Sequence, residues 1–191
     1  MSENLRNYTK AVYAFDHVLK CADAKGIEKA MAKKAPLAGW TGKDVYEHSL
    51  GGLKMVQSFA ATGQGPKSGV KLGKQPLTAW AKLRDQTLES LDHEGVLQST
   101  CEPFGPQMGP MTIDALVGFM GAELVIHTWD MARTARVDEQ LDPSLVKFAQ
   151  ATWKQLPEEV LRMEGMFGAA VKPAQANDAQ TKLLNFAGRT V

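Results

Sequence analysis

The sequence predicts an all-α protein, and three observations lead to that fold class. Long segments without proline carry apolar residues at the helical spacing of three and four positions. Helix-capping residues stand immediately before several of these segments. Apolar and polar residues alternate for no more than a few positions, so we expect no strand. The expected architecture is a four-helix bundle with additional C-terminal helices, in one domain over residues 1–191.

The first half of the chain contains two strong helical segments. The first covers residues 4–23, and a weaker segment over 26–34 ends before a proline and a glycine. The second strong helix begins after Thr41, which is a good N-cap, and extends to about residue 61. Asp44 stands at the third helical position, from which its carboxylate can reach back to the cap.

Two glycine- and proline-rich segments separate the later helices. Residues 63–75 form a connector that can reach roughly 40 Å when extended, enough to recross a bundle. A helix over 77–93 follows, and residues 94–111 then form a loop with three glycines and three prolines. Apolar residues of this loop would either close over a pocket as a lid or merely seal the bundle end: Phe104, Met108 and Met111.

The second half is also helical. A long segment opens at Thr112 and runs unbroken to about residue 136. Asp142 as the cap and Pro143 at the first helical position begin another helix. A last helix is expected over residues 178–187, ended by a glycine.

Composition excludes several classes of function. The 22 Lys and Arg residues nearly balance the 21 Asp and Glu residues, which argues against a nucleic-acid-binding protein. No apolar stretch approaches the roughly 20 residues that span a bilayer, and the polar N-terminus does not resemble a signal peptide. The two cysteines, Cys21 and Cys101, have no metal-site spacing and indicate a reducing compartment. We therefore expect a soluble, cytoplasmic protein that binds neither nucleic acid nor a membrane.

Two of the long helices direct polar residues toward the bundle interior. Glu123, His127 and Asp130 fall within a sector of roughly 60° on the helix that begins near residue 113. His48 lies on the apolar face of the helix that begins after Thr41. Imidazole and carboxylate together suit zinc, nickel or iron, and bundle cores build metal sites from facing helices. The alternative from spacing alone is a hydrogen-bonded polar pair in the core with one further histidine.

Two sequence blocks resemble a known family. Residues 39–48, GWTGKDVYEH, are similar to the GWT-x-x-D-x-x-x-H segment of DinB-like metal-binding proteins. Residues 122–132, AELVIHTWDMA, are similar to the E-L-x-x-H-x-W-D-L-A helix of one branch. That branch comprises the N-terminal domain of mycothiol-dependent maleylpyruvate isomerase and its stand-alone, actinobacterial-type relatives. Residues 167–189 of this chain also resemble the tail of the stand-alone relatives. The chain lacks the Pro-Cys that often precedes Gly-Trp in that branch, and it is too short to hold the isomerase's second domain, so isomerisation of maleylpyruvate is not expected.

The resemblance implies a site and a class of reaction. It places the metal ligands at His48, Glu123 and His127, in a bundle whose second and third helices run parallel and are joined by a crossover. Three protein ligands leave a coordination position open, as in catalytic sites. We expect a divalent metal, zinc before nickel or iron, and a thiol-linked transferase or isomerase that uses a low-molecular-weight thiol and a small-molecule substrate. The alternatives are a metal-dependent hydrolase and a non-catalytic metal-binding or interaction module.

Other polar residues receive more limited expectations. Asp130 would orient a metal ligand or accept a proton, or else pair with Arg133 or Arg136 on its own helix. His17 is expected near the core and His93 at a helix end, and neither is expected to bind metal. Cys101 lies either near the site or in an inert position, and Trp129 belongs to the core or the pocket wall. Bundles with apolar edges also form homodimers, an alternative that the sequence leaves open.

Overall fold

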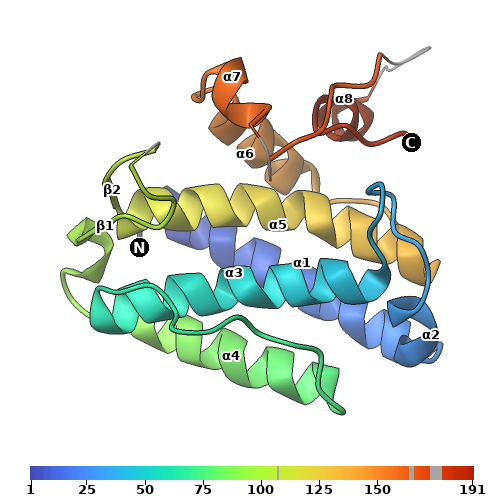
Figure 1. Ribbon diagram of the computed structural model, residues 1–191, viewed down its shortest axis with the longest axis horizontal. Coiled ribbons are helices and arrows are strands. Elements are labelled where there is room, and N and C mark those ends of the chain that lie inside the picture. Colours follow the sequence, from blue (N-terminus) through green and yellow to red (C-terminus); the bar gives the residue numbers. More distant parts are fainter. Residues whose placement is uncertain (107, 164–165, 173–177) are drawn as a thin grey trace.

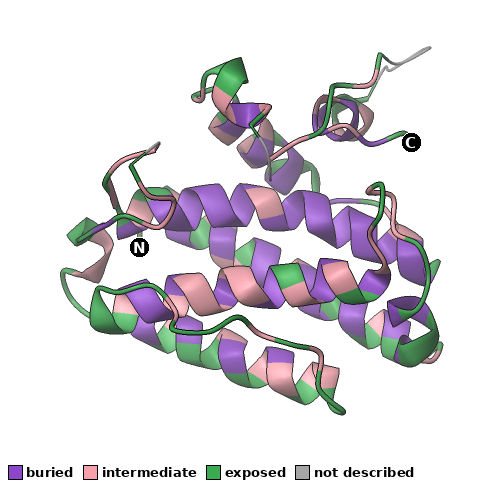
Figure 2. Cartoon of the chain, viewed as in Figure 1, coloured by how far each residue is buried: buried purple, intermediate pink, exposed green. Residues whose placement is uncertain are grey.

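Four long helices form the body of the protein. The computed structural model describes residues 1–106, 108–163, 166–172 and 178–191. Its long helices are α1 (Glu3–Asp23), α3 (Gly42–Thr62), α4 (Pro76–Leu91) and α5 (Ile113–Ala135), which lie side by side in Figure 1. The predicted all-α class is confirmed. The α5 helix is buried along nearly its whole length and is therefore the centre of the core (Figure 2).

Helices α1 and α5 run in the same direction. At their beginnings, the Asn4 side-chain amide donates a hydrogen bond of 2.9 Å to the Asp114 carboxylate. At their ends, the Lys25 ammonium donates one of 2.8 Å to the backbone carbonyl of Arg136. Contacts at both ends fix the two helices in register.

Helices α3 and α4 also run in the same direction. The Tyr46 hydroxyl, near the beginning of α3, donates a hydrogen bond of 2.8 Å to the carbonyl of Pro76, where α4 begins. One turn before the end of α4, the Thr87 hydroxyl lies 3.3 Å from the carbonyl of Leu53. The connector over residues 63–75 must therefore recross the bundle, and Figure 1 shows it running along α3.

The beginning of α3 is fixed by the predicted cap. The Thr41 hydroxyl accepts a hydrogen bond from the backbone N–H of Asp44, and the Asp44 carboxylate accepts one of 2.8 Å from the backbone N–H of Thr41. The same carboxylate accepts a hydrogen bond of 2.6 Å from the Thr41 hydroxyl, and this bond and the one from the Thr41 backbone lower the pKa of Asp44. Gly42 follows the cap against α2 (Ile27–Met31), where a Cβ atom would lie 2.3 Å from the backbone oxygen of Ala30. The cap and this close approach set the register of α3.

The C-terminal helices cover α5 on the side away from α4 (Figure 1). They are α6 (Pro143–Trp153), α7 (Glu158–Leu161) and α8 (Ala179–Phe186). As predicted, Asp142 caps α6 and Pro143 occupies its first position, whereas the four-residue α7 was not expected. Aromatic side chains join this layer to α5, because Trp153 packs edge-on against both Phe119 and Phe167 with ring centroids 5.0 and 4.9 Å apart.

The loop after α4 contains more regular structure than the sequence predicts. A single 3-10 turn, η1 (Val96–Gln98), is followed by β1 (Thr100–Cys101), which pairs antiparallel with β2 (Met111–Thr112). The prediction that the chain has no strand is wrong for this segment. Two-residue strands are too short to produce an alternating pattern, so their pairing depends on the tertiary structure. No helix in the described part of the chain is both long and apolar enough to cross a bilayer.

Candidate metal centre

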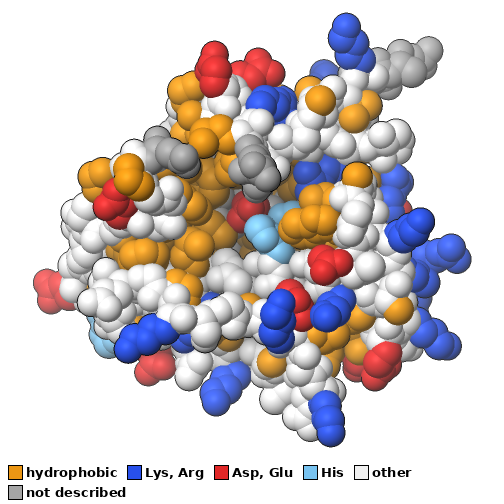
Figure 3. Space-filling model, in the orientation of Figure 1, with side chains coloured by type: hydrophobic (Ala, Val, Ile, Leu, Met, Phe, Trp, Pro, Cys, Tyr) orange, Lys and Arg blue, Asp and Glu red, His pale blue; other side chains and the backbone are white. Residues whose placement is uncertain are grey.

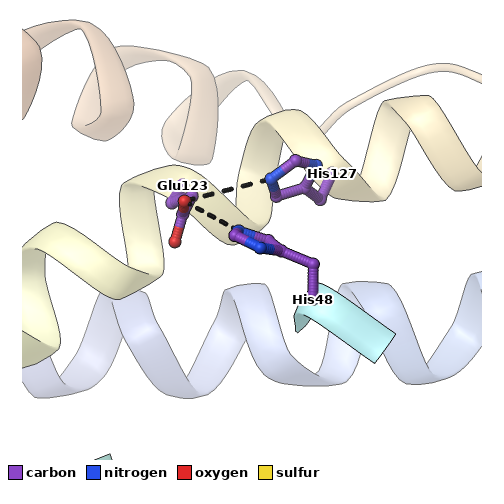
Figure 4. Close-up of side chains that lie close together, drawn as sticks. All are labelled: His48, Glu123 and His127. Atoms are coloured by element: carbon purple, nitrogen blue, oxygen red, sulfur yellow. Dashed lines mark hydrogen bonds and ion pairs between the residues drawn. The ribbon is translucent and has the colours of Figure 1, made fainter. Parts of the chain in front are cut away.

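The structure brings His48, Glu123 and His127 together between α3 and α5 (Figure 4). One ligand atom from each side chain lies within 4.8 Å of the other two. The Glu123 Oε1 atom lies 3.0 Å from His48 Nε2 and 4.0 Å from His127 Nε2. Among the residues that the structure describes, no other group of three His, Cys, Asp or Glu side chains converges in this way. These are the three residues that the sequence motifs single out.

The geometry of the two helices explains the convergence. Glu123 and His127 are one turn apart on α5 and therefore point the same way. The α3 helix runs antiparallel to α5 (Figure 1), and the Met120 methyl group packs over Gly52, where a Cβ atom would lie 2.7 Å from the methyl carbon. His48, one turn before Gly52 on α3, faces Glu123 across the two helices.

His48 and Glu123 form a hydrogen-bonded pair with a distance of 3.0 Å between Nε2 and Oε1. Burial lowers the pKa of His48, but the hydrogen bond and negative charge of Glu123 outweigh it and raise this pKa above its ordinary value. Burial alone would raise the pKa of Glu123, yet the hydrogen bond from His48 and the nearby imidazoles lower it. Glu123 is therefore ionised at neutral pH and presents a negative charge to any cation that enters.

The second nitrogen of His127 is held by a buried ion pair. His127 Nδ1 lies 3.0 Å from Asp130 Oδ2, and the Asp130 side chain is fully buried. The guanidinium of Arg189 donates two hydrogen bonds to this carboxylate, from Nη2 at 2.7 Å and from Nε at 3.2 Å. Burial raises the pKa of Asp130, but His127 and Arg189 together lower it below the ordinary value. An ionised Asp130 accepts a hydrogen bond from the Nδ1–H of His127 and leaves Nε2 facing Glu123.

Arg189 is the functional residue that sequence reasoning misses. Asp130 contacts His127 as expected, but its cationic partner is Arg189 rather than Arg133 or Arg136. Arg133 instead binds Glu139 at 2.8 Å and stacks over the ring of Trp129, which is buried in the core. Because Arg189 lies 59 positions from Asp130, no local spacing could have indicated the pair.

Aromatic side chains complete the surroundings of the two histidines. The Trp40 ring stacks parallel to His127 at 5.9 Å and meets His48 edge-on at 5.2 Å. Trp40 directly precedes the cap of α3, and its ring restrains both imidazoles. On the side of α1, Tyr8 is buried beside a cavity of about 10 Å³ that reaches all three residues. Burial raises the pKa of Tyr8, so its hydroxyl stays neutral.

A groove of about 620 Å³ opens beside His48 and Glu123. Figure 3 shows hydrophobic side chains gathered around a hollow on this face, with histidine side chains at its edge. Phe104 and Met108 from the loop after α4 line the groove, whereas Met111 is not among the described lining residues. The loop therefore forms part of the wall beside the site and does more than seal the bundle end.

The other polar residues lie outside the cluster. His17 is exposed beside the Cys21 thiol, so the expectation that it approaches the core is wrong. His93 is exposed just beyond α4. Cys101 is buried in β1, where burial raises the pKa of its thiol, and it is not among the described residues that line the groove.

The donor set fits a divalent metal. Two imidazole nitrogens and one carboxylate oxygen are a ligand set of catalytic zinc sites. A tetrahedral metal with bonds of about 2.1 Å holds its ligand atoms about 3.4 Å apart. The 3.0 Å between Glu123 Oε1 and His48 Nε2 lies close to that spacing, whereas the 4.0 Å from Glu123 Oε1 to His127 Nε2 and the largest separation of 4.8 Å require the side chains to close around the metal by about 0.6 and about 1.4 Å. The arrangement can hold one metal and leave a side open to the groove.

Comparisons with known proteins show two relatives of unspecified activity. No family model matches the chain, and no solved structure matches it. The chain is similar to the uncharacterised proteins MT0763 and Rv0738 of Mycobacterium tuberculosis strains CDC 1551 / Oshkosh and ATCC 25618 / H37Rv. Each is 27% identical over 160 residues, which cover 82% of this chain and 83% of the relative. Their names state no activity.

Proposed function

We propose that the protein binds one divalent metal, zinc in the first place, through His48, Glu123 and His127. We further propose that it is a metal-dependent enzyme of the thiol-linked transferase or isomerase type. The observation that carries the proposal is the position of the three ligand atoms within 4.8 Å of one another at the wall of a groove. A purely structural metal site would be closed on all sides by protein ligands.

The arrangement of the helices supports a place in the DinB-like class. In the DinB-like proteins that the chain resembles, the metal ligands come from one helix before the crossover and one helix after it. Here His48 belongs to α3, before the connector, and Glu123 and His127 belong to α5, after it. The parallel direction of α3 and α4, joined by the connector over 63–75, agrees with that arrangement.

The residues around the site have separable tasks. His48, Glu123 and His127 would hold the metal, whose Lewis acidity lowers the pKa of a thiol or water and polarises a carbonyl. Asp130 and Arg189 orient His127 from behind, because the carboxylate accepts a hydrogen bond from Nδ1–H and the guanidinium keeps the carboxylate in place. Trp40 covers the imidazoles and limits the approach of water from its side.

Metal content is the first test. Protein purified without a histidine tag should contain about one zinc per chain by elemental analysis. His48→Ala and His127→Ala should each lose the metal, whereas His93→Ala, which removes an exposed histidine, should keep it. Full occupancy in His127→Ala would refute the ligand assignment.

Turnover separates the proposed reaction from its alternatives. The zinc-loaded protein should consume an electrophile only when a low-molecular-weight thiol is present, and the His48→Ala variant should not. Turnover that needs water but no thiol would assign the site to a hydrolase. Full metal occupancy without either reaction would identify a non-catalytic metal-binding module.

A further inference from the structure

The groove beside the candidate metal centre has walls of two kinds. The wall next to α3 and the connector carries the charged residues Glu47 and Lys71 beside apolar ones, and His48 and Glu123 stand at its inner edge; the apolar side chains of this wall are Met55, Pro66 and Val70. The opposite wall, from the loop after α4, from α5 and from the α7 region, is apolar. Its described side chains are Phe104, Met108, Phe119, Met120, Val160, Met163 and Met166.

The charged residues of the first wall already satisfy one another. The Glu47 carboxylate accepts a hydrogen bond of 2.7 Å from the backbone N–H of Leu72 and lies 3.5 Å from the Lys71 ammonium. Lys43 lies 3.8 Å from the same carboxylate. Glu47 therefore ties the connector to α3. It leaves His48 and Glu123 as the polar groups of the groove that face the metal position.

The groove has the size and composition of a ligand site. Small-molecule pockets occupy about 300–1,000 Å³ and combine apolar walls with a few convergent polar groups. At about 620 Å³, this groove falls within that range, and its convergent polar groups are the proposed metal ligands at one end. A fully charged or sugar-like molecule would leave its polar groups unsatisfied against the apolar wall.

We propose that the substrate is an amphipathic small molecule. Its reactive polar end would lie at His48 and Glu123, and its straight or aromatic hydrocarbon part would extend along the apolar wall. This inference rests on the proposed metal-dependent function and specifies the substrate class of the same site. Methionine side chains are flexible and polarisable, and they adapt to ligands of different shape. With Met55, Met108, Met120, Met163 and Met166 around it, the groove accepts a series of hydrocarbon groups rather than one rigid outline.

A homologous series of ligands tests this substrate class. Straight-chain alkyl hydroxamic acids with two to ten carbons carry the same metal-binding head and differ only in the hydrocarbon chain. Their dissociation constants are measured by calorimetry on zinc-loaded and on metal-free protein. Each buried methylene should strengthen binding about fourfold until the groove is full. A gain below about 1.5-fold per methylene across the series would overturn the proposal.

A blocked groove is the matching variant. Gly51 lines the groove, and a Cβ atom there would meet only Val70 at 3.7 Å, so Gly51→Leu places a side chain in the groove without a backbone clash. In this variant the gain per methylene should end several carbons earlier than in the wild type. Ala61→Leu, which adds the same side chain at an exposed position of the same helix, should behave like the wild type. Thermal unfolding verifies that both variants fold.

The effects of zinc and of chain length on hydroxamate binding distinguish an error in the metal site from an error in the substrate class. If the protein binds no metal, all hydroxamates bind equally well with and without zinc, but the gain per methylene persists. If the substrate is not amphipathic, zinc strengthens the binding of every hydroxamate, but chain length has no effect. A dimer in sedimentation that excludes the hydroxamates would assign the groove to a second copy of the chain and overturn the proposal.

Discussion

Replacing Arg189 with methionine tests how the site is held from behind. The guanidinium donates two hydrogen bonds to Asp130, and its Nη1 donates a third to the backbone carbonyl of Ala187. Methionine preserves most of the side-chain volume but removes the charge and every one of these bonds. The fully buried Asp130 carboxylate would keep His127 as its side-chain partner.

The expected loss of stability is large because a buried charge loses its partner. Breaking a buried ion pair by removing one member costs about 3–5 kcal/mol. For a chain of this size, each kcal/mol lowers the melting temperature by about 2–4 °C, so Arg189→Met should melt about 6–20 °C below the wild type. Loss of the group that fixes a ligand's orientation should also weaken zinc binding about 10- to 100-fold.

Thermal unfolding and zinc competition against a chelator measure the two effects. Arg133→Met is the matched control, because Arg133 pairs with Glu139 at a partly exposed site, where an ion pair contributes about 0–1 kcal/mol. The pKa of Asp130 is lowered in the folded state. The ionised Asp130 carboxylate therefore stabilises the folded protein above the unfolded-state pKa of about 3.9, and this contribution is lost as the pH falls through the folded-state pKa. The stability difference between wild type and Arg189→Met should therefore narrow below about pH 4. Equal melting temperatures for Arg189→Met and Arg133→Met at pH 7 would refute the reasoning.

Three further predictions follow from single positions. Zinc affinity should fall as the pH drops through the pKa of His48, which lies above the ordinary value of about 6.5, because metal and proton compete for the imidazole. Competition titrations between about pH 5.5 and 8.5 measure this affinity, and a constant value would contradict the ligand assignment. Gly42→Ala should lower the free energy of unfolding by about 1–3 kcal/mol, because the new Cβ atom would lie 2.3 Å from the backbone oxygen of Ala30 in α2. Gly51→Ala has room for its Cβ atom and should raise the free energy of unfolding by about 0.5–1 kcal/mol. Chemical denaturation compares the two variants, and equal effects would contradict the packing explanation. Iodoacetamide at pH 7.5 should modify the partly exposed Cys21 well before Cys101, because the Cys101 thiol is buried and its pKa is raised. Mass spectrometry of the timed reaction measures both rates, and faster labelling of Cys101 would show that β1 opens readily.

Local sequence determined the helices and the direction of the site residues. Caps and apolar spacing depend on a few neighbouring residues, so the beginning of α3 at Thr41 and the extent of α5 were predictable to within a few positions. The i, i+4 spacing of Glu123 and His127 likewise fixes their common direction on one helix. Matching polar residues on two helices, together with the family-like motifs, placed His48 opposite them.

Only the tertiary structure decided what surrounds that cluster. The pairing of Asp130 with Arg189 joins residues 59 positions apart, and it depends on the C-terminal segment folding back onto α5. The stacking of Trp40 on both histidines depends on the path of the segment before α3, and the two-residue strands depend on contacts across the loop. The groove is formed by side chains from segments between residues 47 and 166, which no local pattern relates. Such contacts arise from how the helices pack, and periodicity within one helix carries no information about which distant side chain will fill the space beside it.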